Sequence, residues 1–280
     1  MYHTFVAKSP AVLDVLRVID EVAKTRTPVL FTGECGTGKE LFAEQVHIRA
    51  GADTSFVRVN CMTAATGADL AKAFASADGG TVFLDEVAAL ARSLQETVLA
   101  LLQKTSARVV AATSRDLERM AADGAFDRAL FYCLNVLPLH IPPLRERKED
   151  IAPLAQFFLA HFGRETKKAF AGFSPDAMQV LCGQYWPGNV RELRNTVERA
   201  SMFGAPPLIE AGQLGLAVPE DGCSVSSGGE RTLKAAVTRF KVAYVRQILN
   251  ETAWNQTKAG KVLGIQRTYL SRLLHELHIR

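Results

Sequence analysis

The first half of the chain alternates between two spacings of hydrophobic and polar residues. Between Val12 and Val22, apolar residues recur every three or four positions, which is typical of one face of a helix. Short apolar or β-branched runs follow, separated by stretches with the helical spacing. These runs predict strands at Val29–Thr32, Phe56–Asn60, Thr81–Asp85, Val109–Thr113 and Val136–His140. Regular alternation of this kind predicts an α/β fold of three layers, in which helices cover both faces of a parallel five-stranded sheet.

The hydrophobic pattern changes after this region, and the changes predict domain boundaries. Residues 1–150 form the predicted α/β part. Residues 151–217 show helical spacing only, with breaks at Gly172 and at Trp186–Gly188. Residues 218–230 are rich in glycine, serine and acidic residues, so a linker is predicted there. Residues 231–280 return to helical spacing and predict a separate all-α domain.

The composition is that of an ordinary soluble globular protein. Of the 280 residues, 48% are hydrophobic and 22% are charged. No apolar run approaches the roughly 20 residues that span a bilayer, and the first residues lack a signal-peptide pattern. The five cysteines are scattered, which favours reduced thiols over disulfides or a metal site. A cytoplasmic location without membrane contact is therefore predicted.

Charge is divided unevenly along the chain. Residues 231–280 contain ten Lys or Arg and two acidic residues, a net charge of +8. The other 23 basic and 27 acidic residues give −4. An acidic body with a basic tail predicts that only the tail contacts a polyanion. The alternative is a solvated helical surface, and charge alone does not separate the two.

A glycine-rich loop follows the first predicted strand and precedes a predicted helix. In such a loop the backbone N–H groups turn toward phosphates, and the lysine reaches the terminal phosphates. The strand–loop–helix order disfavours the alternative, a glycine-rich turn with a coincidental lysine. The predicted nucleotide contacts are Gly33, Glu34, Cys35, Gly36, Thr37, Gly38, Lys39 and Glu40. Glu40 stands where a P-loop usually has a hydroxyl residue that holds magnesium.

Two acidic residues end the third predicted strand. Asp85 and Glu86 follow four apolar or β-branched residues, as expected for a buried strand that delivers carboxylates to its carboxyl end. Asp85 is predicted to hold Mg²⁺ with the nucleotide, and Glu86 to polarise an attacking water. Taken alone, the pair also fits a helix N-cap. Together with the glycine-rich loop it favours catalysis on ATP.

The basic tail predicts a helix-turn-helix. Leu233, Val237, Phe240, Tyr244 and Ile248 form a largely apolar stripe suited to helix packing and to a dimer. Two further helices are predicted at 255–263 and 266–274, joined by a turn at Gly264. The predicted contacts with double-stranded DNA are Lys258, Lys261, Gln266, Arg267, Thr268, Tyr269 and Arg272. The alternative is a basic helical module for protein contact.

Many short motifs of one protein family occur here in the family's order. The chain resembles the bacterial enhancer-binding proteins, the AAA+ activators of sigma-54 RNA polymerase. The motifs that carry this resemblance are Ser9-Pro10, Gly33–Glu40, Asn60-Cys61, Ala77–Thr81, Leu84–Glu86, Ala111–Leu117, Leu134–Val136, Pro142–Arg147, Glu149–Ile151 and Trp186–Leu193.

The resemblance implies domains, cofactors, assemblies and roles for individual residues. It implies an AAA+ nucleotide-binding subdomain at 1–150, a small helical lid at 151–217 and a Fis-type helix-turn-helix at 231–280. The implied cofactors are ATP or ADP with Mg²⁺, and the implied assemblies are a dimer and a hexameric ring. Asn60 is implied to restrain Glu86 according to nucleotide state, and Arg191 to be the lid sensor that reaches the phosphates. The family usually has a regulatory domain ahead of the ATPase, so its absence here leaves two alternatives, control by a separate protein or a fragment.

Three departures from the family change the expected function. The sigma-54-contacting Gly-Ala-Phe-Thr-Gly-Ala loop is missing, and Asn60 and Asp85 are separated by only a short segment. Asp127 and Cys133 stand at the positions whose arginines act on the neighbouring subunit's nucleotide, and Arg128 lies one position out of register. Ser114 replaces the sensor asparagine. Nucleotide binding with weak or absent hydrolysis in the isolated chain is therefore expected.

These observations lead to one favoured function and two alternatives. The favoured function is a bacterial DNA-binding transcriptional regulator that uses nucleotide for assembly and does not itself activate sigma-54 polymerase. The first alternative is an active ATPase that remodels another target or completes its site in a mixed ring with a paralogous AAA+ regulator. The second is a scaffold that needs no nucleotide. RNA polymerase is a further expected partner.

Overall fold

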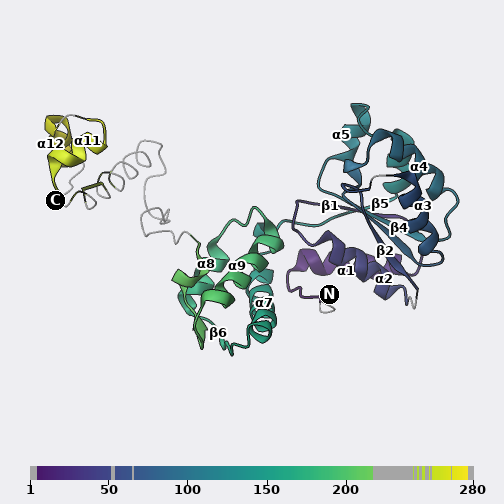
Figure 1. Cartoon of the computed structure of the whole chain (residues 1–280), viewed down its shortest axis with the longest axis horizontal. Helices are drawn as coiled ribbons and strands as arrows, with labels where there is room; N and C mark the ends of the chain where they lie inside the picture. The colour runs from purple at the N-terminus through teal and green to yellow at the C-terminus, as the bar shows by residue number, and fades with distance from the viewer. Residues whose placement is uncertain are drawn as a thin grey trace. The chain divides into compact units, whose positions relative to one another are not determined.

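The computed structural model describes two units of the chain. The described residues are 5–51, 54–64 and 66–216, and in the tail 242, 245, 248–249, 252, 254–265 and 267–276. The first unit comprises Met1–Leu216 and the second Ala217–Arg280 (Figure 1), and each is described by itself.

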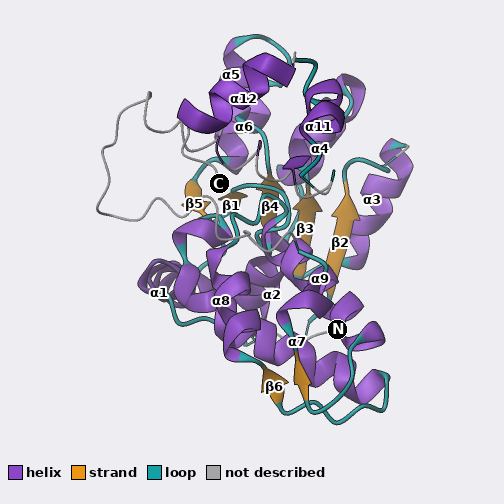
Figure 2. Ribbon diagram, turned by 90° about the vertical axis from the view of Figure 1, so that its left-hand side faces the viewer, coloured by secondary structure: helices purple, strands orange, loops and turns teal. Residues whose placement is uncertain are grey.

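A parallel five-stranded sheet forms the centre of the first unit. Its strands are β1 (Val29–Thr32), β2 (Phe56–Asn60), β3 (Thr81–Asp85), β4 (Arg108–Thr113) and β5 (Leu137–His140), in the order β2-β3-β4-β1-β5 (Figure 2). The predicted parallel sheet is confirmed. Two strand bounds were wrong by one residue. β4 begins at Arg108, one residue before its predicted start. β5 begins one residue after its predicted start, because Val136 is apolar but lies in the turn after a helix and is 55% exposed.

Helices cover both faces of this sheet, as predicted. One face packs against α1 (Pro10–Ala23) and α2 (Lys39–Arg49). The other packs against four helices, α3 (Gly67–Ser76), α4 (Arg92–Leu102), α5 (Leu117–Ala122) and α6 (Arg128–Leu134). Neighbouring strand residues belong to different faces, because side chains alternate along a strand. Val82 and Leu84 face α3–α6, whereas Phe83 faces α1 and α2.

The connection from β2 to β3 is short and direct. The chain turns after Asn60, where the Cys61 N–H donates to the Asp85 carbonyl at 2.9 Å. α3 then begins behind its N-cap Thr66, whose hydroxyl accepts from the Asp69 N–H. Met62, in the turn, is 71% exposed. Among its described residues, this crossover therefore consists of a turn, one helix and a second turn.

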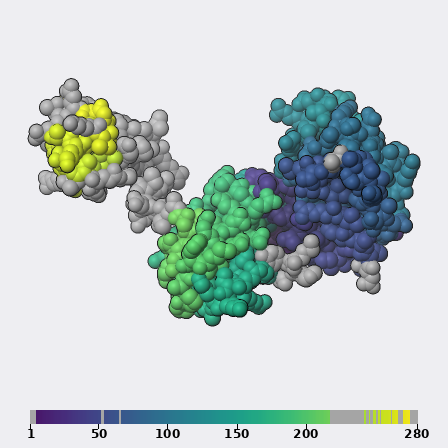
Figure 3. Space-filling model, in the orientation of Figure 1, coloured from purple at the N-terminus to yellow at the C-terminus, as the bar shows by residue number. Residues whose placement is uncertain are grey.

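A helical region completes the first unit. It contains α7 (Ile151–Glu165), α8 (Pro175–Gly183) and α9 (Asn189–Phe203), and its atoms are coloured teal to green in Figure 3. The prediction of helices alone was wrong here. Two short parallel strands, β6 (Gly172–Phe173) and β7 (Leu208–Ile209), pair between the helices. They are too short to carry an alternating pattern that a sequence could reveal. The 3-10 turns are η1 (Val87–Ala89), η2 (Leu144–Glu146), η3 (Lys148–Asp150) and η4 (Ala211–Leu214).

The described part of the second unit includes two helices whose bounds are fixed, and helical residues at 242, 245 and 248–249 precede them. The two helices are α11 (Gln256–Val262) and α12 (Arg267–Glu276), and Gly264 between them has φ +68°, a left-handed conformation that glycine adopts easily. The predicted linker at 218–230 and the stripe residues Leu233, Val237, Phe240 and Tyr244 lie outside the described residues. The small core consists of Val245, Ile248, Leu249, Ala259, Leu270 and Leu274. None of the helices in the described residues combines the length and apolar character that crossing a membrane requires.

His47 makes the stability of the first unit depend on pH. Its ring is 8% exposed, and Nδ1 lies 3.0 Å from the Thr81 hydroxyl. Burial lowers the pKa of His47 below 6.5, because it disfavours the charged ring. The neutral ring therefore contributes stability that is fully present above pH 6.5 and is lost as the pH falls through the lowered pKa.

Replacing His47 with glutamine is expected to flatten the fall in unfolding free energy between about pH 7.5 and about pH 5.5. Denaturant titration at the two pH values measures this slope. His161→Gln is the control, because His161 is 37% exposed. An unchanged slope in His47→Gln would exclude His47 as its source.

Candidate nucleotide-binding site

The glycine-rich loop wraps around the start of α2. Gly36 has φ +80°, and a Cβ there would lie 2.3 Å from the Gly188 carbonyl oxygen, so only glycine fits at this contact. Gly38 has φ +98° and precedes α2 directly. The loop therefore brings its backbone N–H groups to the positive end of a helix, where an anion is stabilised.

Lys39 lies across this loop. Its side chain is 6% exposed, and Nζ donates to the Gly33 carbonyl at 2.8 Å and to the Glu34 carbonyl at 3.1 Å. The Glu86 carboxylate is 3.4 Å from Nζ. The predicted lysine and the predicted catalytic carboxylate are thus brought together.

Ser114 holds Glu86 in place. Glu86 has φ +53°, a strained value for a side chain of this size, and its Oε2 accepts from the Ser114 N–H at 3.0 Å and from the Ser114 hydroxyl at 2.8 Å. Asn60 instead accepts the Met62 N–H at 2.9 Å. The contact expected between Asn60 and Glu86 is therefore made by Ser114 in this structure.

A basic side chain occupies the space beside Asp85. Arg58 donates from Nη2 to Asp85 Oδ2 at 2.7 Å and pairs through Nη1 with Glu40. Asp85, the predicted magnesium residue, and Glu40, which stands where a P-loop usually has a magnesium-holding hydroxyl, are therefore both paired with a guanidinium, so the donor set does not fit the ion. Within the described residues, no group of three or more His, Cys, Asp or Glu is placed to hold a metal. Sequence reasoning missed Arg58, although its spacing from Asn60 places both on one face of β2.

The helical region contacts the loop through a second set of charged groups. Arg145 donates to Glu34 through Nη1 at 2.8 Å and Nη2 at 2.6 Å, and Asn189 Nδ2 donates to the same carboxylate at 3.1 Å. These hydrogen bonds lower the pKa of Glu34 to about 2. Arg147 Nη2 donates to the Thr37 carbonyl at 2.6 Å. The loop is thus fixed from one side by residues distant in sequence.

Arg191, the predicted lid sensor, lies beside the glycine-rich loop. Its Nη1 is 2.9 Å from the Cys35 sulfur, and its backbone N–H donates to the Gly36 carbonyl at 3.3 Å. Arg191 is therefore positioned next to the phosphate-binding backbone.

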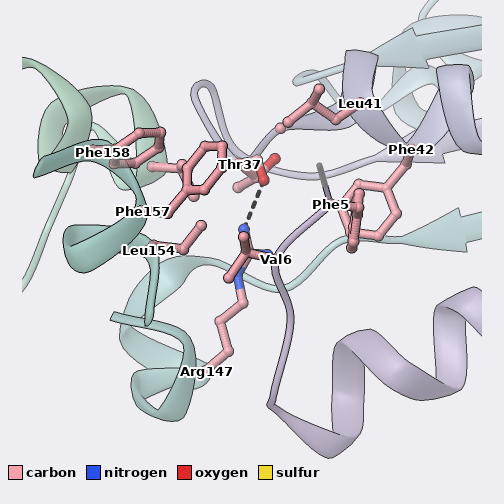
Figure 4. A pocket seen from close by; sticks show the side chains of 11 residues that line it. Phe5, Val6, Thr37, Leu41, Phe42, Arg147, Leu154, Phe157 and Phe158 are labelled. Carbon is pink, nitrogen blue, oxygen red and sulfur yellow. Dashed lines mark hydrogen bonds between the residues drawn. The ribbon is translucent and has the colours of Figure 1, made fainter. Parts of the chain in front are cut away.

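An apolar pocket adjoins the same loop, and sequence reasoning missed it. Aromatic side chains from the N-terminal segment and from α7 face each other across it (Figure 4). Its signal in the sequence is an apolar pattern on segments about 150 residues apart, which no local motif connects. The lining residues are Phe5, Val6, Thr37, Gly38, Leu41, Phe42, Arg147, Leu154, Phe157, Phe158 and Val190.

Asp127 and Cys133, which replace the arginines of the resembled family, provide no guanidinium here. The Asp127 carboxylate caps α6 by accepting the Leu130 N–H at 2.9 Å. Arg128 Nε donates to the Ala121 carbonyl at 3.2 Å, at the end of α5. Cys133 is exposed. Arg128 is thus bound within its own subunit.

The predicted DNA contacts are described only in part. Lys258 on α11 and Arg272 on α12 are exposed. Lys261, Arg267, Thr268 and Tyr269 lie on these helices, but their side chains fall outside the described residues, as does Gln266 entirely.

The chain matches known proteins over its whole length. Residues 6–144 match the Sigma-54 interaction domain and residues 145–224 the AAA+ ATPase lid domain. Regulatory protein AtoC of Escherichia coli is 34% identical over 308 residues, covering 97% of this chain and 67% of AtoC. Transcriptional regulatory protein ZraR of Klebsiella oxytoca is 36% identical over 301 residues, covering 96% and 68%. The crystal structure of NtrX from Brucella abortus in complex with ADP superposes with a TM-score of 0.72 at 30% identity, covering 100% of this chain and 70% of NtrX.

These matches agree with the parallel sheet, the glycine-rich loop and the helical region that contacts it. The chain spans about two thirds of the length of AtoC and ZraR. The chain therefore belongs to the family of AAA+ transcriptional regulators that carry a sigma-54 interaction domain.

Proposed function

We propose that this chain is a DNA-binding transcriptional regulator that binds ATP or ADP and uses the nucleotide for assembly. The observation that carries the proposal is the convergence of Lys39 and Arg191 on the glycine-rich loop. Two cations and a helix start at one loop suit a polyphosphate. The proposed place of action is the bacterial cytoplasm.

The apolar pocket supports a nucleotide over a simple phosphate. It opens beside Thr37 and Gly38, so a base bound there lies next to phosphates held by the loop. Phe5, Phe157 and Phe158 provide aromatic surface for a purine. NtrX, the relative described above, has been crystallised with ADP, which supports the same ligand here.

Hydrolysis by the isolated chain is proposed to be weak or absent. Lys39 and Ser114 each contact Glu86, as a hydrolytic site requires. Positions 127 and 133 hold aspartate and cysteine in place of arginine, and Arg128 donates a hydrogen bond to the end of α5. An arginine supplied to a neighbouring nucleotide contributes roughly 10³-fold or more in related NTPases.

ATP turnover measured against protein concentration tests this proposal. Wild-type chain is expected to match the background of Glu86→Gln at every concentration, because assembly adds no arginine. A rate that rises with concentration and disappears in Glu86→Gln would show a competent ring of identical chains. In a minimal transcription system, activation of sigma-54 polymerase by the purified chain would also reject the proposal.

The tail is proposed to bind double-stranded DNA through α11 and α12. Their buried side chains include Ala259, Leu270 and Leu274, so Lys258 and Arg272 are left on the exposed side. A short turn at Gly264 between two such helices, together with the net charge of the tail, suits a helix-turn-helix against phosphates.

Replacing Lys258 and Arg272 together with alanine is expected to weaken binding to a mixed-sequence duplex roughly tenfold or more, and to lower the salt slope of the affinity by about 2. Fluorescence anisotropy over a salt series measures both quantities. The matched control replaces two exposed cations, Arg17 of α1 and Lys24 directly after it, with alanine. Equal losses of DNA affinity in both double variants would mean that DNA binds to surface charge in general. Unchanged DNA affinity in the Lys258 and Arg272 variant would favour a tail that contacts protein.

A mixed ring is a second candidate function. The assembled contacts of Lys39, Glu86 and Ser114 favour it, because an arginine from a neighbouring subunit is one part that this chain does not supply at the expected positions. A complete paralogous AAA+ regulator could supply that arginine to this chain. ATP turnover that appears only when such a paralogue is mixed with this chain, and that Glu86→Gln in this chain abolishes, would support it.

A further inference from the structure

Arg58 is placed at the point where two carboxylates of the nucleotide site meet. It lies on β2, where it pairs in register with Phe83 of β3, and its side chain extends toward the start of α2. One guanidinium nitrogen donates to Asp85 Oδ2 at 2.7 Å, and the other pairs with Glu40. Arg58 thus joins the second residue of α2 to the end of β3.

The charges around the loop divide into two groups. In the first group, the Lys39 amine lies 3.4 Å from the Glu86 carboxylate. In the second, Arg58 pairs with the carboxylates of Glu40 and Asp85. The side chains of Asp85 and Glu40 are 18% and 32% exposed, so their charges are only partly screened by water. Without Arg58, both would face an incoming polyphosphate uncompensated.

A guanidinium differs from a divalent cation in ways that matter here. It carries a single charge that is present at all ordinary pH values, and its planar donors suit carboxylates and phosphates alike. It is tethered to the sheet, so no ion has to be captured from solution. Magnesium, by contrast, needs free oxygen ligands in octahedral geometry.

We propose that Arg58 is a built-in cation that takes the place of magnesium between Asp85 and Glu40, so that this chain binds nucleotide without a divalent ion. The inference rests on the proposed nucleotide binding and deepens it. It assigns Arg58 the role of offsetting part of the negative charge of the two carboxylates and of facing the phosphates of ADP.

The proposal is tested by ADP affinity in excess EDTA and in excess magnesium, measured by calorimetry on the full chain. The wild type is expected to differ by less than about threefold between the two buffers. Arg58→Gln is expected to bind ADP roughly tenfold more weakly in EDTA, because one charge-assisted contact is lost, and to recover in magnesium. Arg58→Lys keeps the charge and is expected to restore much of the EDTA affinity, which separates a charge effect from a folding defect.

Two further measurements sharpen the test. Arg17→Gln removes an exposed arginine of α1 and is expected to leave both affinities unchanged. Electron paramagnetic resonance with Mn²⁺ and ADP is expected to show more protein-bound Mn²⁺ in Arg58→Gln than in the wild type. Two results would overturn the inference while leaving nucleotide binding intact. One is a wild type whose ADP affinity is tenfold or more higher in magnesium than in EDTA, and the other is an Arg58→Gln variant with wild-type ADP affinity in EDTA. Absence of ADP binding in both buffers would instead overturn the proposed function itself.

Discussion

Replacing Lys39 with alanine is expected to weaken ADP and ATP binding by roughly a hundredfold or more. The Lys39 amine is buried, lies across the glycine-rich loop and is held by the Gly33 and Glu34 carbonyls. Loss of two charge-assisted hydrogen bonds to phosphate, each contributing about 1.5–3 kcal/mol, accounts for this magnitude. Titration with a fluorescent ADP analogue, with unlabelled ATP as competitor, measures the change.

Lys104→Ala is the matched control for this variant, because Lys104 is exposed at the end of α4. The ADP affinity of Lys104→Ala is expected to equal that of the wild type. Thermal unfolding of Lys39→Ala without nucleotide shows whether the variant folds. If the wild type bound ADP no more tightly than a folded Lys39→Ala chain, the result would contradict the role of Lys39 and favour the scaffold alternative.

Replacing Trp186 with alanine is expected to cost about 3–5 kcal/mol of unfolding free energy. Trp186 is 1% exposed and is the largest fully buried side chain of the helical region, packed among residues of α7, α8 and α9. Its indole N–H donates to the Leu181 carbonyl at 2.9 Å, near the end of α8. The substitution therefore leaves both a cavity and an unpaired carbonyl.

Urea unfolding followed by circular dichroism measures this loss. Phe203→Ala is the control, because Phe203 belongs to α9 but is 82% exposed, and its replacement is expected to change stability by less than about 0.5 kcal/mol. Equal effects of the two substitutions would mean that Trp186 does not hold the three helices together.

The strands were predictable because each one is a local pattern. Buried parallel strands such as Thr81–Asp85 are continuous apolar runs, and their ends follow where polar residues begin. Val136 shows the limit, since an apolar residue in an exposed turn has the same appearance as a strand residue. The β6–β7 pair has only two residues on each strand, so packing decides it.

The candidate site was predictable wherever one short motif supplies it. The glycine-rich loop, Asp85 and Glu86 each lie within a few neighbouring residues. The contacts of Arg58 with Glu40, and of Arg145 with Glu34, join segments that meet only after folding. Choosing between Asn60 and Ser114 as the partner of Glu86 requires interatomic distances, which no spacing along the chain contains.

The direct crossover between β2 and β3 makes this chain a suitable host for protein engineering. Its turn is exposed at Met62, and the strand register on either side is fixed by the pairing of Asn60 with Asp85. Lengthening such a turn costs only about 0.6 kcal/mol for each doubling of its length. A transplanted surface loop can therefore be accepted without loss of the fold. Asp127 and Cys133 would be unchanged in such a chimaera. It would therefore show whether a transplanted loop can bind its target without any gain in ATP hydrolysis.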